Sequence, residues 1–75
     1  MKNLINGDAV KRNMKSARVK AGYTQTTAAN ALGVTKTTLC NWEKDPAKLK
    51  FEKFIRLAQL YGVNVSYFLG LEEKQ

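Results

Sequence analysis

The sequence contains no histidine and a single cysteine, Cys40. Without histidine it lacks the commonest metal ligand and the commonest general base, and one thiol forms neither an internal disulfide nor a zinc site. The sequence therefore predicts no metal, no cofactor, no small-molecule ligand and no catalytic site. A lone cysteine, interpreted as a passive free thiol, favours a reducing, cytoplasmic setting.

Long apolar runs are also missing. None approaches the roughly 18 residues of a membrane-spanning helix, and residues 1–8 lack the apolar stretch of a signal peptide. A chain of 75 residues buries a modest core but does not build two lobes around a deep cleft. Size therefore argues against an enzyme, and hydropathy argues against a membrane partner.

Acidic residues are scarce at one end of the chain. Between residues 1 and 22 the only acidic residue is Asp8, whereas acids and bases balance between residues 51 and 75. The bases of the first stretch are Lys2, Lys11, Arg12, Lys15, Arg18 and Lys20. With a formal net charge of +7, this distribution predicts one positive surface that faces a polyanion. Charge alone leaves a merely solvated basic surface as the alternative.

Glycines and capping residues divide the chain into five predicted helices. The first is expected to begin at an Asp8 cap and to end near Ala21, with a buried stripe formed by Val10, Met14, Ala17 and Ala21.

The second and third helices are expected at residues 25–32 and 36–44. Thr24 and Thr35 stand at their N-cap positions, and Gly33 fits a left-handed turn between them. At about 100° per residue, the polar side chains of the third helix share one arc and the apolar ones point away. The polar arc holds Lys36, Thr37, Cys40, Asn41 and Lys44, and the apolar side holds Leu39 and Trp42.

The rest of the chain is predicted to form a loop, two helices and a tail. Residues 45–48 are expected to be a loop because Pro46 disfavours helix before it. A fourth helix is expected from about residue 50 to 61, and Asn64 is expected to cap a fifth through Leu69. The expected core positions of the fourth helix are Phe51, Phe54, Ile55, Ala58 and Leu60, with Leu57 beside them.

The most specific feature is the spacing of residues between 24 and 43. It reads Thr24-Gln25-x-x-x-Ala29-x-x-Leu32-Gly33-Val34-Thr35-x-x-x-Leu39-x-Asn41-Trp42-Glu43, and Leu57-Ala58-x-Leu60-x-Gly62-Val63-Asn64 extends it. Two capped short helices joined by a glycine turn are typical of a helix-turn-helix. Over about residues 13–70 the chain resembles the lambda repressor/Cro-like helix-turn-helix family.

This resemblance implies a compact all-α, five-helix DNA-binding domain at residues 10–70, with the helix-turn-helix formed by helices 2 and 3. Residues 1–9 are then an N-terminal arm and residues 71–75 a charged tail. With so short a tail, the chain is expected to be Cro-like, as in small phage-type or mobile-element regulators, without the second domain of full-length repressors.

The resemblance also assigns roles to residues. Those matching base-reading positions in the major groove are Lys36, Thr37 and Asn41, whose side chains suit guanine, thymine and adenine edges. Those matching phosphate-contacting positions are Thr24 and Gln25, with Thr35, Thr38 and Lys44 as weaker candidates. The alternatives are that the threonine caps are only caps and that the base-reading residues form a solvated helix face.

Arg18 and Glu43 match a semi-buried salt bridge between the first and third helices of some relatives. The sequence departs from the family pattern at three places. Lys44-Asp45 replaces a common Asn-Gly, Leu49-Lys50 replaces a common Pro-Ser, and Ala28 replaces a common leucine. The first two departures bear on the path of residues 44–50 more than on the overall fold.

The leading interpretation is a transcription regulator that binds double-stranded DNA as a homodimer on a two-fold-symmetric operator, because one recognition helix reads few base pairs. Tyr61, Tyr67 and Leu71 are candidates for the dimer interface, whereas Val65, Phe68 and Leu69 are expected in the core. The alternative is a protein-interaction module, such as an antitoxin, built on the same fold. The polar and basic face of the third helix favours DNA.

Overall fold

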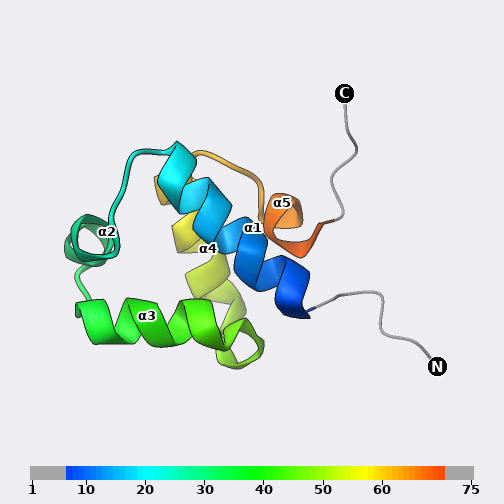
Figure 1. Cartoon of the computed structure of the whole chain (residues 1–75), viewed down its shortest axis with the longest axis horizontal. Helices are drawn as coiled ribbons and strands as arrows, with labels where there is room; N and C mark the ends of the chain where they lie inside the picture. Colours follow the sequence, from blue (N-terminus) through cyan, green and yellow to red (C-terminus); the bar gives the residue numbers. More distant parts are fainter. Residues whose placement is uncertain (1–6, 71–75) are drawn as a thin grey trace.

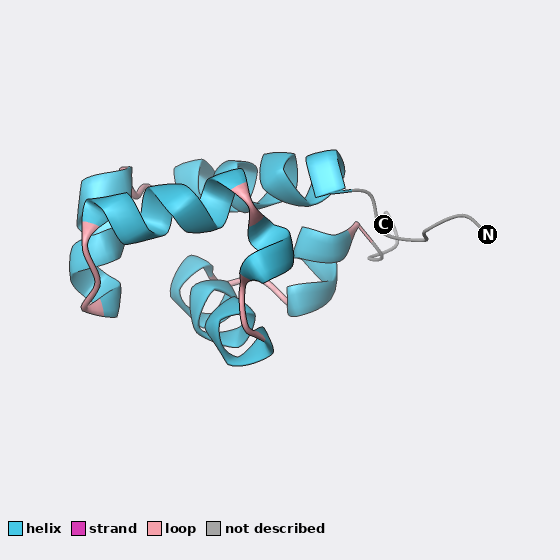
Figure 2. Cartoon of the chain, turned by 90° about the horizontal axis from the view of Figure 1, so that it is seen from below, coloured by secondary structure: helices cyan, strands magenta, loops and turns pink. Residues whose placement is uncertain are grey.

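The computed structural model describes residues 7–70, and every regular element in that range is helical. The elements are α1 (Gly7–Lys20), α2 (Gln25–Leu32), α3 (Lys36–Lys44), the 3₁₀ turn η1 (Pro46–Lys48), α4 (Phe51–Tyr61) and α5 (Val65–Leu69). Short loops join them (Figures 1 and 2). The expected all-α, five-helix architecture is thus confirmed.

The start of α1 differs from the prediction. Asp8 lies inside the first turn, where its charge suits the helix dipole, and is not the residue that precedes the helix. Residues 7–9, expected in an arm, are helical; the rest of that arm, like the tail at 71–75, lies outside the described residues. The other error in α1 concerns Ala21, which is exposed because the helix has already ended at Lys20.

The core is formed where α1, α4 and α5 meet. Met14, Leu57 and Phe68 are at most 1% exposed. Phe68 packs against three other aromatic rings at centroid distances of 6.1–6.5 Å, as in the edge-on or tilted pairs favoured by aromatic quadrupoles.

Two hydrogen bonds add to the docking of α5 on α1, one from Asn13 Nδ2 to the Phe68 carbonyl and one between Ser16 Oγ and the Tyr67 hydroxyl. Val65 and Leu69, expected in the core, are only partly buried against it.

The buried face of α4 is rotated from the predicted one. Phe51 is 67% exposed, while Leu57 is completely buried. At 100° per residue these two side chains point about 120° apart, so they cannot share the centre of one face. Tyr61, about 40° from Leu57, lies in the core at 6% exposure. The prediction of Tyr61 as a dimer-interface residue is therefore wrong.

Two small residues let α2 lie close to the helices beside it. Ala28 and Ala29 are 0% and 1% exposed, and α2 contacts both α3 and α4. Gly33 then reverses the chain with φ of 74°, a left-handed conformation that is strained for residues with a Cβ. Its turn is closed by a hydrogen bond from Val34 N to Ala29 O of 3.0 Å. Alanine in place of the common leucine at 28 is thus compatible with close packing.

The segment after α3 is a 3₁₀ turn where the sequence predicted a loop. Asp45 ends α3 with a negative φ of −140°, so this position does not require the glycine that is common in the family. Pro46 opens η1, where a proline needs no N–H, and is buried. Lys50 stands at the N-cap of α4 without a side-chain cap bond, which agrees with the loss of Pro-Ser.

The hydroxyl of Tyr61 is buried and makes no hydrogen bond within the described residues. Burial, followed by the charge of Glu43, raises the pKa of Tyr61 from 10.0 to about 12. Because the folded pKa is the higher one, the stability linked to neutral Tyr61 is complete below about pH 10 and is lost as pH rises through about 12.

We predict that Tyr61→Phe leaves the free energy of unfolding unchanged or raises it, because it removes an unpaired buried polar group without emptying the ring site. Tyr61→Ala should lower it by about 3–5 kcal/mol through the cavity it leaves. Urea denaturation at neutral pH measures both. A loss above 1 kcal/mol for Tyr61→Phe would show that the hydroxyl has a stabilising partner.

Candidate nucleic-acid interface

Threonine pairs cap both helices of the helix-turn-helix. Thr24 Oγ1 accepts a hydrogen bond from Thr27 N at 3.0 Å, and Thr27 Oγ1 accepts one from Thr24 N at 2.9 Å. This is a capping box in which threonine stands where glutamate or glutamine is usual. Thr35 Oγ1 likewise accepts from Thr38 N at 3.1 Å. The expected capping roles of Thr24 and Thr35 are confirmed, and both caps lie at helix N-termini, where backbone N–H groups favour an anion.

The two faces of α3 separate as the sequence predicted. Leu39 is fully buried, and Trp42 packs partly buried against the core. The residues assigned to DNA contact on the opposite side are exposed, namely Lys36, Thr37, Asn41 and Lys44. Thr38 and Cys40 are half-buried. α3 therefore offers solvent a continuous row of polar and cationic side chains.

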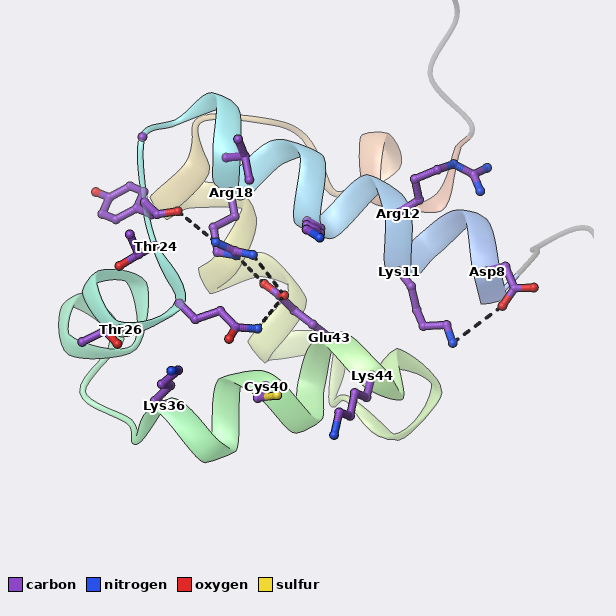
Figure 3. A pocket seen from close by; sticks show the side chains of 15 residues that line it. Asp8, Lys11, Arg12, Arg18, Thr24, Thr26, Lys36, Cys40, Glu43 and Lys44 are labelled. Carbon is purple, nitrogen blue, oxygen red and sulfur yellow. Dashed lines mark hydrogen bonds and ion pairs between the residues drawn. The ribbon is translucent and has the colours of Figure 1, made fainter.

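A broad concavity of about 1010 Å³ lies between α1, the start of α2 and α3 (Figure 3). Its walls carry Lys11, Arg12 and Lys15 from α1, and Lys36 and Lys44 from α3. The three cations of α1 were not among the residues that sequence reasoning assigned to the site. The signal that pointed to them was the excess of basic residues in the first 22 positions.

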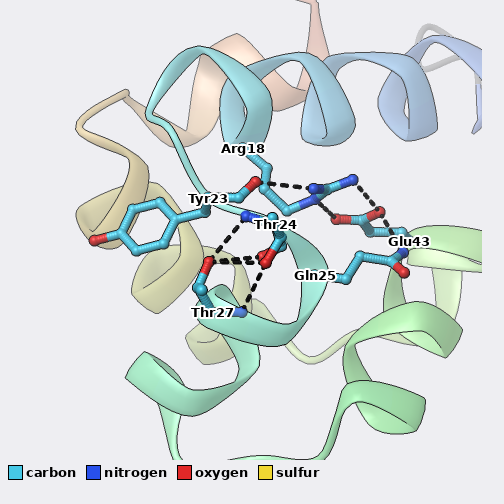
Figure 4. Close-up of polar contacts among 6 residues, drawn as sticks. All are labelled: Arg18, Tyr23, Thr24, Gln25, Thr27 and Glu43. Carbon is cyan, nitrogen blue, oxygen red and sulfur yellow. Dashed lines mark hydrogen bonds and ion pairs between the residues drawn. The ribbon is translucent and has the colours of Figure 1, made fainter.

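A buried ion pair lies within this concavity. Arg18 Nε donates to Glu43 Oε2 at 2.7 Å, and the two side chains are 8% and 10% exposed. Arg18 Nη1 also donates to the Tyr23 carbonyl at 3.0 Å (Figure 4). The expected salt bridge between the first and third helices is thus present, and it also holds the turn that leads into α2.

Gln25 belongs to the same network. Its Nε2 donates to Glu43 Oε1 at 3.2 Å, and the residue is half-buried. Sequence reasoning assigned Gln25 to phosphate contact and missed this bond. An amide nitrogen has two N–H groups, so one can bond Glu43 while the other is available to an anion.

Within residues 7–70, no group of three or more potential metal-binding side chains occurs. The helices of that range are also too short or too polar to cross a membrane.

The geometry defines a helix-turn-helix domain in which the exposed polar face of α3 lies beside a basic concavity. A family model described as helix-turn-helix matches residues 14–68, and the chain belongs to this family, of lambda repressor/Cro type, whose members are DNA-binding regulators and not enzymes. The chain is 39% identical over 62 residues to the HTH-type transcriptional regulator ImmR of Bacillus subtilis (strain 168). That alignment covers 83% of this chain and 49% of ImmR, so the chain spans about half the length of this relative.

We predict that Arg18→Ala and Glu43→Ala each lower the free energy of unfolding by about 3 kcal/mol, because each leaves a buried charge without its partner. The double variant should lose less than the two losses combined, with a coupling of about 0.5–3 kcal/mol. Urea denaturation followed by Trp42 fluorescence gives all four values of the cycle. Additive losses would mean that the two side chains do not stabilise each other.

Proposed function

We propose that this domain binds double-stranded DNA sequence-specifically and regulates transcription by placing α3 in the major groove. The observation that carries the proposal is the exposed polar face of α3 beside a basic concavity on a helix-turn-helix. The similarity to a transcriptional regulator supports it. Repression in the manner of Cro proteins is the particular form of regulation that we propose.

Base reading is assigned to Lys36, Thr37 and Asn41. All three are exposed on α3, away from the buried Leu39. Asn41 is suited to a bidentate pair of hydrogen bonds with adenine, Lys36 to guanine O6 or N7, and the Thr37 methyl to thymine. None of the three makes a hydrogen bond to another side chain that would need to break first, within the part of the chain described.

Phosphate contact is assigned to residues at helix ends. Thr24 and Gln25 open α2, Thr35 and Thr38 open α3, and Lys44 lies in the last turn of α3. Besides the N–H groups that the threonine caps already bond, the two N-termini present backbone donors at the positive end of the helix dipole, and Lys44 adds a full charge. These contacts position the helix and carry no direct sequence information.

We propose that two copies bind a two-fold-symmetric operator with half-sites about 34 Å apart, one helical turn. Tyr61 is in the core and cannot supply the contact. Tyr67 is half-buried, with its hydroxyl bonded to Ser16, so its exposed part remains a candidate. Leu71, the third candidate, lies outside the described residues.

Selection of bound sites from random duplexes tests the proposal. We predict enrichment of a consensus in which two inverted half-sites are centred about one helical turn apart, because a symmetric dimer reads each half-site with one α3. Enrichment of a single half-site would support sequence-specific binding but reject the proposal that two copies bind. Failure to enrich any sequence would reject sequence-specific binding.

We predict that Asn41→Ala relaxes the preference at particular base pairs by about 1–3 kcal/mol of discrimination, since it removes a base contact. Lys44→Gln should instead weaken binding to all duplexes alike, because a phosphate contact is independent of sequence. Competition binding with single-base variants of the selected site separates these two patterns. The placement of α3 would be wrong if Asn41→Ala weakened every duplex equally while the helical circular dichroism stayed at wild type.

A further inference from the structure

Two rows of cations face each other across the concavity. Lys11 and Lys15 are four residues apart on α1 and so lie on one face of that helix. Lys36 and Lys44 stand about 12 Å apart on α3, with Cys40 between them. Figure 3 shows Lys11 on α1, and Lys36 and Lys44 on α3, around the concavity, which Lys15 also lines. The α3 row has a role in the proposed function, whereas the α1 row has none.

The acidic groups in the concavity do not neutralise these rows. Six basic side chains and two carboxylates line it, which leaves a net charge of +4. Glu43 is already paired with Arg18 at 2.7 Å. Asp8 is 3.7 Å from Lys11, but its side chain is 85% exposed, and an exposed pair of this kind is weak. Lys11 can therefore exchange this carboxylate for a stronger anionic partner.

The chemistry around the rows indicates a phosphodiester strand. Thr24, Gln25 and Thr26, at the start of α2, line the same concavity, so N-terminal N–H donors and the lysines face one space. Along α1, Lys11 and Lys15 are about 6 Å apart, a length that corresponds to roughly two steps of 3.4 Å axial rise along one DNA strand. A repeating anion matches this spaced series of cations.

We propose that one sugar-phosphate strand of the bound duplex passes through this concavity, where Lys11 and Lys15 of α1 contact its phosphates. The strand is the one that borders the major groove occupied by α3 and that meets the start of α2. This inference rests on the proposed DNA-binding function and extends its contact surface to α1. The domain then holds the same strand from two helices, α1 on one side and α3 on the other.

The test compares two double variants that remove equal charge. In Lys11→Gln/Lys15→Gln the charges come from the concavity; in the control, Lys20→Gln/Arg56→Gln, they come from exposed positions that do not line it. Binding to the selected duplex is measured from low to high salt, and circular dichroism checks the fold of each protein.

We predict that the concavity variant reduces the log–log salt slope by about 1.8, or 0.9 for each lost phosphate contact, and lowers affinity about 50-fold at 0.1 M salt. The ranking of base-pair variants should stay as in wild type. In wild type, ethylation of two or three adjacent phosphates on one strand of each half-site should interfere with binding. In the concavity variant, ethylation of the same phosphates should no longer interfere. The control should keep the wild-type slope and interference pattern.

If the concavity variant matched the control in slope and interference while wild type still bound its selected site, this inference would be overturned and the proposed function would stand. Lys11 and Lys15 would then have no role in DNA binding, and an acidic protein would be the partner to test for them. If wild type selected no duplex at all, the proposed function itself would fail. The two failures are therefore distinguishable.

Discussion

The arrangement of this domain depends on the ion pair between Arg18 and Glu43. It joins residues 25 positions apart in the chain, and both side chains are at least nine-tenths buried. Through the Tyr23 carbonyl and the Gln25 amide, the same two charges also fix the turn into α2 and its first residue. Three helices are thus held by one polar cluster in a domain whose apolar core is small. The energetic consequence is asymmetric, because either charge alone is costly to bury while the pair is tolerated.

The same pair has an electrostatic role that follows from its neutrality. An unpaired buried acid beside the proposed DNA-facing surface would repel phosphates. With Arg18 bonded to Glu43, the pair contributes little net field, and the exposed lysines of α1 and α3 determine the sign of the potential. Glu43 can therefore hold α3 against α1 without weakening the attraction of the domain for a polyanion.

Local features were predictable from the sequence, and features that depend on distant packing were predicted less well. Thr24, Thr35 and Gly33 act within four residues of their own position, so capping and turn chemistry place them correctly. Phe51 and Tyr61 were misplaced because apolar spacing alone does not say where on the helix the buried face is centred, which the packing of α4 in the core decides. The hydrogen bond from Gln25 to Glu43 joins residues 18 positions apart, and no periodic pattern in the sequence indicates it. Family resemblance supplied the Arg18–Glu43 pair, which composition and spacing could not.

In the proposed function, α3 serves both recognition and stability, and this accounts for the order of its residues. Leu39 fixes the helix to the core and Glu43 fixes it to α1, whereas Lys36, Thr37 and Asn41 point to solvent. Because the two anchors are four residues apart, they lie on adjacent turns and hold both the rotation of the helix about its axis and its tilt. A base contact needs both angles defined, since hydrogen bonds weaken steeply when misaligned. In the proposed function, the buried residues of α3 thus contribute to sequence discrimination without touching DNA, because they limit the directions in which the exposed residues can point.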